Sequence, residues 1–144
     1  MKIEIRHRPF DPWQELTSYQ QTGSTAASSY GATALFVGTM RDFNEGDRVH
    51  GMTLEHYPGM TEKHLEAICH NATSRYNLLD ALVIHRVGPI QPGEPIVLVA
   101  VWSVHRAAAF DACRLIMDDL KSKAPFWKKE ELDEGKVRWV DHNT

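Results

Sequence analysis

Two lysines, Lys121 and Lys128, flank Pro125 near the end of this 144-residue sequence. Proline has no amide hydrogen and disfavours helix at the residue before it. We therefore expect Lys121 on the last turn of a helix and Lys128 on an extended segment beyond it. Two ammonium groups on separate elements can converge on one pocket and bind an anion there. The alternative is that both lysines only interact with the dipole of a helix C-terminus, which stabilises a fold by about 0.3–1 kcal/mol each.

The segment from Ser103 to Arg106 is a second candidate site for an anion. It follows an almost wholly apolar stretch, residues 96–102, and precedes a long helical pattern. A strand that leads into a helix exposes free backbone amides at the positive end of that helix, so a phosphate would meet N–H donors, the His105 imidazole and the Arg106 guanidinium. The alternative is that Ser103 only caps the helix and Arg106 is solvated.

A further cation, Arg41, follows a predicted strand in a glycine-containing loop, where binding residues often lie. A guanidinium can hold a phosphate through two parallel hydrogen bonds, each charge-assisted and contributing roughly 1.5–3 kcal/mol. Taken alone, an arginine in a loop is a weak indication of a binding site.

The overall composition confines this cationic chemistry to local sites. The formal net charge is −3 and the pI is near 6.2, which argues against a general nucleic-acid-binding protein. Cys69 and Cys113 lie on the apolar faces of predicted helices without CxxC spacing, so we expect both to be reduced core residues. The sequence has no run of 18 apolar residues and no hydrophobic N-terminal signal, which favours a cytoplasmic protein without a membrane segment.

The sequence predicts neither a metal site nor a bound cofactor. No GxSxG nucleophile motif, P-loop or dinucleotide fingerprint is present. The adjacent carboxylates Asp118 and Asp119 point in different directions on a helix, as is typical of a solvated face. The following histidines lack HExxH or other metal-ligand spacing: His50, His56, His64, His70, His85 and His142.

The order of the predicted elements indicates one α+β domain over residues 1–144, with a mixed or antiparallel sheet and about three helices packed on it. Strand 96–102 is apolar on both faces, so we expect it in the centre of the sheet. Residues 21–31, rich in Ser, Thr, Gly and Ala, are expected to form a mobile loop. The other predicted strands lie at residues 3–5, 32–37 (a buried strand), 49–57, 81–85 and 137–140, with a hairpin or long loop at 38–48 and a turn at 89–93.

Helix signals are clear at three places. Asp11 and Pro12 predict an N-cap and a first helical position for a helix to about Gln20. Thr61 is expected to cap a second helix, with Leu65, Ile68, Cys69 and Ala72 on its buried face. The third helix spans about 106–123, and its predicted buried residues are Phe110, Cys113, Ile116, Met117 and Leu120.

Five short motifs follow one another along the chain between about Ala34 and Trp139. They are Phe36-Val37-Gly38-Thr39-Met40-Arg41, Leu54-Glu55-His56-Tyr57-Pro58-Gly59-Met60, Ile84-His85-Arg86-Val87-Gly88, His105-Arg106, and Lys121-Ser122-Lys123-Ala124-Pro125-Phe126-Trp127-Lys128. Together they resemble the large, catalytic subunit family of molybdopterin synthase. Linked motifs at consistent spacing are far more specific than any single one. The resemblance also implies a β-rich subdomain of the α/β-hammerhead-like kind.

The resemblance implies an enzyme, a sulfurtransferase that acts in molybdenum cofactor biosynthesis without a bound cofactor. In that family a small ubiquitin-like sulfur-carrier subunit inserts its C-terminal Gly-Gly tail, which ends in a thiocarboxylate, into a pocket of the large subunit. The substrate is cyclic pyranopterin monophosphate, and two sulfurs are added to give molybdopterin, a dithiolene. The large subunits form a central homodimer with one small subunit at each outer end, which makes a heterotetramer.

The resemblance also implies roles for individual residues. Lys121 matches the position nearest the tail, where a cation neutralises the thiocarboxylate and stabilises charge as sulfur leaves the acyl carbon. Lys128 matches a second lysine close to the pterin, where it could act by proton transfer or by charge stabilisation. Arg41, His105 and Arg106 match positions that grip the substrate's phosphate, from one chain of the dimer or from both. Other aligned pocket positions, of which the first two fit a core role equally well, are Phe36, Met117 and Glu130.

Two other functions stay open at this point. The same cationic slot could capture ubiquitin-like tails without performing chemistry. Alternatively, Arg41, His105 and Arg106 could form a sensor for a phosphate-containing ligand. The presence of both Lys121 and Lys128 favours the enzyme, because a sensor of phosphate needs neither.

Overall fold

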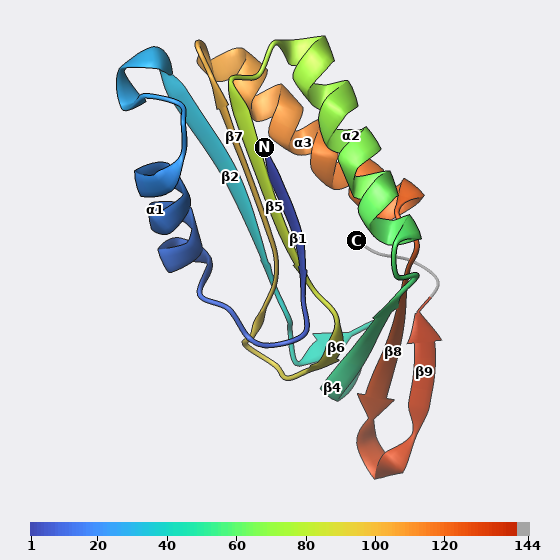
Figure 1. The fold of residues 1–144 in the computed structure, drawn as a ribbon. Helices are drawn as coiled ribbons and strands as arrows, with labels where there is room; N and C mark the ends of the chain where they lie inside the picture. Colours follow the sequence, from blue (N-terminus) through green and yellow to red (C-terminus); the bar gives the residue numbers. More distant parts are fainter. Residues whose placement is uncertain (141–144) are drawn as a thin grey trace.

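A computed structural model describes residues 1–140 of the chain (Figure 1). It confirms the predicted α+β class. The strands are β1 (Lys2–Arg6), β2 (Ala32–Thr39), β3 (Phe43–Asn44), β4 (Asp47–His56), β5 (Asp80–Arg86), β6 (Gly88–Ile90), β7 (Pro95–Ser103), β8 (Phe126–Leu132) and β9 (Val137–Val140). The helices are α1 (Pro12–Thr22), α2 (Met60–Tyr76) and α3 (Arg106–Lys123), with short 3-10 turns at Ala27–Ser29 and Asp133–Gly135.

One layer of the fold is a four-stranded sheet in the order β1-β5-β7-β2. Strand β1 runs parallel to β5, and the other neighbours are antiparallel. Helices α2 and α3 cover one face of this sheet and α1 covers the other (Figure 1). Strand β7 lies inside the sheet and is buried over its central residues, as its apolar sequence predicts.

Alternation along β7 explains how one strand serves two cores. Successive side chains of a strand point to opposite faces. Val97, Val99 and Val101 therefore pack under α2 and α3, whereas Leu98 and Trp102 pack toward α1.

Truncation of Leu98 tests this two-sided core. Leu98 is completely buried, so Leu98→Ala is expected to lower the free energy of unfolding by about 2–5 kcal/mol, through lost apolar burial and the cavity left behind. Denaturant unfolding of the two proteins measures the difference. The control is Arg114→Ala, whose side chain is 85% exposed and whose removal should change stability by less than about 0.5 kcal/mol. A loss at Leu98 no larger than that of the control would contradict the packing.

The second layer is a β-rich subdomain in the order β3-β4-β8-β9, with β6 also paired to β4. All of these pairings are antiparallel. The subdomain has its own small core, built from Met40, Val49, Met52, Leu54, Val87 and Ile90. This is the β-rich subdomain that the resemblance implied. Because β4 pairs with β8, residue Lys128 lies opposite Leu54.

Local signals predict the start of α1 and the end of α3 correctly. The Asp11 carboxylate accepts hydrogen bonds from the amides of Trp13 (3.0 Å) and Gln14 (3.3 Å), and Pro12 is the first helical residue. Helix α3 ends before Ala124, which is extended, as expected for the residue before Pro125.

The structure corrects the prediction for strand 32–37, which is an edge strand and is not buried. Leu35 and Phe36 are 37% and 41% exposed. The short apolar run looks like a buried strand, but among residues 1–140 only β7 pairs with it. Position in the sheet depends on distant pairing partners, which a local pattern does not specify.

Helix α3 buries four of the five predicted residues, Cys113, Ile116, Met117 and Leu120, but not Phe110. Phe110 is 68% exposed. Ala109 and Ala112 lie in the core instead, in a stripe that continues through Cys113, Ile116, Met117 and Leu120. Phe110 is one position, or about 100°, away from Ala109 on the helix and therefore points outward. The prediction that Phe110 is buried is therefore wrong, and the small Ala109 occupies the core position.

Thr61 does not cap α2. Gly59 occupies the N-cap with a φ of 83°, a conformation that favours glycine. The Thr61 hydroxyl accepts a hydrogen bond from the Tyr57 amide (2.9 Å) and donates one to the Pro125 carbonyl (3.0 Å). The start of α2 is thereby tied to the turn between α3 and β8.

Three smaller expectations have mixed outcomes. Cys69 and Cys113 are both buried and free, as predicted. The predicted turn at 89–93 is in part wrong, because residues 88–90 form β6. Within 21–31, α1 continues to Thr22 and a 3-10 turn follows; the mobility of this segment stays a prediction. In the part of the chain that the structure describes, no helix is long and apolar enough to cross a membrane.

Candidate active site

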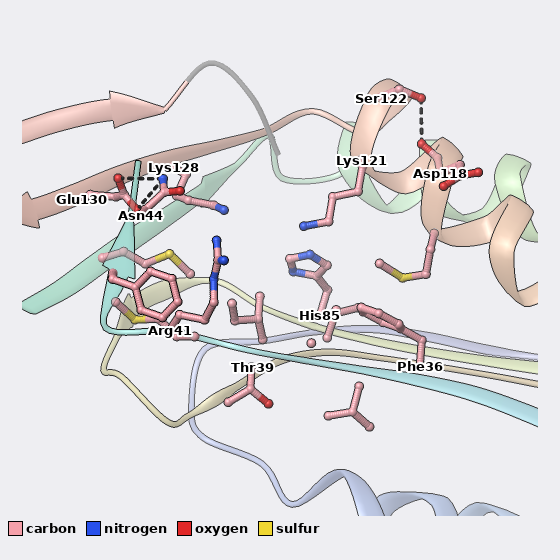
Figure 2. Close-up of a pocket in the computed structure, with 18 residues that line it drawn as sticks. Phe36, Thr39, Arg41, Asn44, His85, Asp118, Lys121, Ser122, Lys128 and Glu130 are labelled. Carbon is pink, nitrogen blue, oxygen red and sulfur yellow. Dashed lines mark hydrogen bonds between the residues drawn. The ribbon is translucent and has the colours of Figure 1, made fainter. Parts of the chain in front are cut away.

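A cavity of about 1160 Å³ opens where the C-terminal end of α3 meets the junction of the two sheets. Lys121 and Lys128 both line it, on a helix and on a strand as their spacing around Pro125 predicts (Figure 2). The other predicted site residues that line the same cavity are Phe36, Arg41, Met117 and Glu130.

Strand β8 directs its side chains alternately. Lys128 and Glu130 face the cavity, whereas Trp127 before them and Glu131 after them are exposed. The sharp stop of α3 at Pro125 lets the chain turn into β8. Consequently Lys121 approaches the cavity from the helix and Lys128 from the sheet (Figure 2).

The electrostatic environment of the cavity disfavours further positive charge. Burial, followed by the charges of Lys128 and Arg41, lowers the pKa of Lys121 to about 8. Burial also lowers the pKa of Lys128, an effect that Glu130 opposes and Arg41 reinforces. Within residues 1–140, neither ammonium group makes a hydrogen bond or an ion pair. An anionic ligand would supply the missing partner.

His85 is a cavity residue that the sequence analysis missed, because the histidines were considered only as metal ligands. It lies in the buried run of β5, and its ring stacks on Phe126 at 4.0 Å. Its Nδ1 lies 2.8 Å from the Arg86 carbonyl, which can only accept, so Nδ1 carries the hydrogen. Burial lowers the pKa of His85 to about 4, with smaller contributions from Lys121 and Lys128. The ring is therefore neutral at pH 7 and offers Nε2 to the cavity as an acceptor.

Arg138, outside the cavity, was also missed. The side chain of Glu130 is buried, and its carboxylate accepts hydrogen bonds from Arg138 and Asn44. The two residues are paired by the register of the sheet, which places Glu130 directly opposite Arg138. The local sequence does not reveal this pairing.

The structure does not bring His105 and Arg106 into this cavity of the same chain. They are exposed at the start of α3, whereas Lys121 is on its last turn. At 1.5 Å per residue, Arg106 and Lys121 are separated by about 22 Å along the helix axis. Ser103 does not cap α3, since its hydroxyl donates to the His105 carbonyl.

The described residues also bear on metal binding. Across residues 1–140, no group of three or more His, Cys, Asp or Glu side chains is placed to hold a metal ion. His142, considered above with the other histidines, lies outside the described residues.

Comparison with known proteins gives consistent matches. The profile of the MoaE protein family matches residues 5–123. The molybdopterin synthase catalytic subunit of Pseudomonas aeruginosa is 52% identical over 143 residues, which cover 98% of this chain and 91% of that protein. A molybdopterin biosynthesis MoaE protein from Burkholderia ambifaria has a TM-score of 0.80 at 43% identity, with 99% of this chain and 90% of that chain covered. Molybdopterin synthase from Staphylococcus aureus has a TM-score of 0.85 at 28% identity, with 97% of each chain covered.

Proposed function

Because the chain belongs to the MoaE protein family, we propose that it is the catalytic subunit of a molybdopterin synthase. The observation that carries this proposal is the cavity in which Lys121, Lys128 and Arg41 converge and in which neither ammonium group has a partner among the described residues. Such a cavity suits a reaction that joins two anions, a thiocarboxylate and a cyclic phosphate. The enzyme acts in the cytoplasm and holds no cofactor of its own.

The sulfur donor is the C-terminal Gly-Gly thiocarboxylate of a small ubiquitin-like subunit. Lys121 neutralises this anion as the tail enters the cavity. The thiocarboxylate sulfur bonds to an electrophilic carbon of the substrate, and a carbon–oxygen bond at that carbon breaks so that the oxygen leaves with a proton. Water then attacks the acyl carbon of the tail, and the bond between the acyl carbon and sulfur breaks. The tail leaves as a carboxylate and the sulfur stays on the product. Lys121 stabilises the negative charge that develops on the acyl oxygen in this step.

The acceptor is cyclic pyranopterin monophosphate. Lys128 lies beside the pterin, where it stabilises charge or moves a proton, and Arg41 holds the phosphate through charge-assisted hydrogen bonds. His85 is the neutral acceptor in a cavity otherwise rich in donors, so it suits an N–H group of the pterin. Phe36, Met117 and Glu130 complete the walls. Each molecule of product consumes two thiocarboxylated tails, because the dithiolene contains two sulfurs.

The second chain of a homodimer supplies His105 and Arg106. The separation of about 22 Å along α3 keeps the pair of one chain away from the Lys121 of that chain, although both residues match family positions for the phosphate. In a two-fold dimer each chain can offer the start of its α3 to the cavity of the other. One small subunit then docks at each outer end to complete the heterotetramer.

Reconstitution tests the proposal directly. The purified chain is mixed with a thiocarboxylated small subunit and cyclic pyranopterin monophosphate, and the dithiolene product is measured. Product formation is expected. Tail binding without product, given a small subunit that is active with a known synthase, would favour a silent binding module instead. Phosphate-ligand binding that survives loss of both lysines, again without product, would favour a sensor.

The lowered pKa of Lys121 predicts how tail binding depends on pH. The cation is needed to pair with the anion, so affinity for a synthetic peptide ending in a Gly-Gly carboxylate should fall as the pH rises above about 8. The fall is at most about tenfold per pH unit for one proton. Calorimetric titration between pH 6.5 and 9.5 measures it. Lys121→Met should bind weakly with a much flatter profile, and an equally steep profile in that variant would assign the proton elsewhere.

The same shift affects stability, with a defined sign. The pKa of Lys121 is lower in the folded chain than its ordinary value of 10.5, so the folded state binds this proton less tightly. Lys121 therefore lowers the free energy of unfolding by its full amount below about pH 8, and this destabilisation diminishes as the pH rises from about 8 toward 10.5. The wild-type chain should gain stability relative to Lys121→Met across that window.

A further inference from the structure

The carboxylate of Glu130 is a negative charge in the wall of a cavity that we propose binds anions. It lies on the same face of β8 as Lys128, two residues away, and is buried. A carboxylate so placed would normally pair with the nearest ammonium group and cancel the charge that an incoming anion needs. No ion pair or hydrogen bond joins Glu130 to Lys128. The carboxylate is directed instead toward β9.

Arg138 holds this carboxylate from outside the cavity. Its Nη2 and Nε donate to one Glu130 oxygen at 2.9 and 3.2 Å, and the two residues are direct partners across β8 and β9. The Asn44 amide donates to both oxygens of the same carboxylate at 3.2 Å. Figure 2 shows Asn44 at Glu130, with the amine of Lys128 pointing away from the pair toward Arg41 and Lys121.

Arg138 also joins Glu130 to the hairpin of β3 and β4. Its Nη2 donates to the Asn44 carbonyl at 3.2 Å, and its Nη1 lies 2.9 Å from the Asp47 carboxylate. Arg41 precedes this hairpin, with its guanidinium 5.0 Å from the centre of the Phe43 ring. One guanidinium therefore contacts both the strand that carries Lys128 and the hairpin beside Arg41.

We propose that Arg138 is a positioning residue that keeps Lys128 available to an anionic ligand by holding the carboxylate of Glu130. Its effect on turnover rests on the proposed function, whereas its effect on Lys128 does not. Without Arg138, Glu130 turns to Lys128, and a ligand anion must compete with a carboxylate that belongs to the chain.

The charged and titratable groups that face Lys128 fix the design of the test. Glu130 is on its own strand, Arg41 follows β2, Lys121 is on α3 and His85 is on β5. Among the described residues, Glu130 is the one whose charge raises the pKa of Lys128, so the effect of Arg138 should shrink when Glu130 is made neutral.

A double-mutant cycle on the chain alone, with no partner or substrate, is the primary experiment. The Lys128 ammonium is titrated by NMR in wild type, Arg138→Met, Glu130→Gln and the double variant. Arg138→Met is expected to raise the pKa of Lys128, and Glu130→Gln is expected to lower it. In the Glu130→Gln background, Arg138→Met should produce less than half of its original rise. Equal rises in both backgrounds, or no rise in either, would overturn the proposal.

A matched control separates charge from anchoring of the hairpin. Asp47→Asn removes the closer of the two ion pairs that Arg138 makes with the hairpin, the other being with Glu45 at 3.5 Å, and leaves its contacts to Glu130 in place. It should leave the pKa of Lys128 unchanged. If Asp47→Asn raises that pKa as much as Arg138→Met does, hairpin position and not the carboxylate controls Lys128, and the proposal fails.

Kinetics provide the second readout. With competent small subunit, Arg138→Met should raise the KM for the phosphate-containing substrate roughly tenfold, as expected for loss of one charge-assisted contact, and should change kcat less. Arg138→Lys, which restores the charge without the two-pronged contact, should recover part of this loss. A normal KM in Arg138→Met would contradict the positioning role. If wild type gives no product while the NMR cycle gives the expected pattern, the proposed function fails and the role of Arg138 stands.

Discussion

Lys121→Ala is expected to lower turnover by about 100- to 1000-fold, the range seen when one group that stabilises an oxyanion is removed. Lys121 is the cavity cation nearest the entering tail in our proposal, and no other described side chain compensates its charge. Steady-state formation of dithiolene, with saturating thiocarboxylated partner, measures the effect. Saturation matters because weaker docking of the tail would otherwise add to the loss in the chemical step.

The same substitution should leave the fold intact. The protonated Lys121 is disfavoured by burial and by two neighbouring cations, so its removal should not lower the melting temperature at pH 7. Lys123→Ala is the matched control, since Lys123 lies on the same helical turn but pairs with Asp119 and is largely exposed. It should retain nearly normal turnover. A parallel loss of melting temperature and turnover in Lys121→Ala would assign Lys121 a structural role.

Mixing two impaired variants should restore about one quarter of wild-type turnover. Arg106→Ala alone should weaken substrate binding roughly 30- to 150-fold, through loss of a charge-assisted contact of about 2–3 kcal/mol. In a mixed dimer of Lys121→Ala and Arg106→Ala, one cavity carries both defects and the other carries neither. Random exchange makes half of the dimers mixed, and half of their cavities are intact.

The measurement is turnover at a substrate concentration near the wild-type KM, after subunit exchange of equal amounts of the two variants. Each variant is assayed unmixed as the control. If both residues served the same chain, every cavity would carry one defect and mixing would restore nothing. That result would reject a shared site, and an unchanged substrate affinity in Arg106→Ala would place the phosphate elsewhere.

Much of the secondary structure could be predicted because its causes are local. Pro125 ends α3 through the geometry of its own ring, and Asp11 caps α1 through amides two and three residues away. The apolar stretch of β7 predicts burial on both faces wherever the strand lies. Phe110 shows the limit of this reasoning, because helical periodicity alone did not decide whether the core stripe contains the phenylalanine or the small Ala109 beside it.

The candidate site was predictable to the extent that its residues follow local breaks in the chain. Lys121 and Lys128 lie on either side of a forced turn, so their convergence on one cavity could be anticipated. His85, Asn44 and Arg138 could not be found in this way. Their partners are defined by strand register, and a shift of one residue would turn every side chain of a strand to the opposite face.

The amino-acid sequence by itself determined the element types, the end of α3 and the cationic character of the cavity, since these depend on neighbours within a few positions. Tertiary structure decided that β2 is an edge strand, that Glu130 meets Arg138, and that His105 and Arg106 lie about 22 Å along α3 from Lys121. Those features depend on which distant segments pair and pack. Pairing is selected by the free energy of the whole fold, which no local stretch of sequence contains.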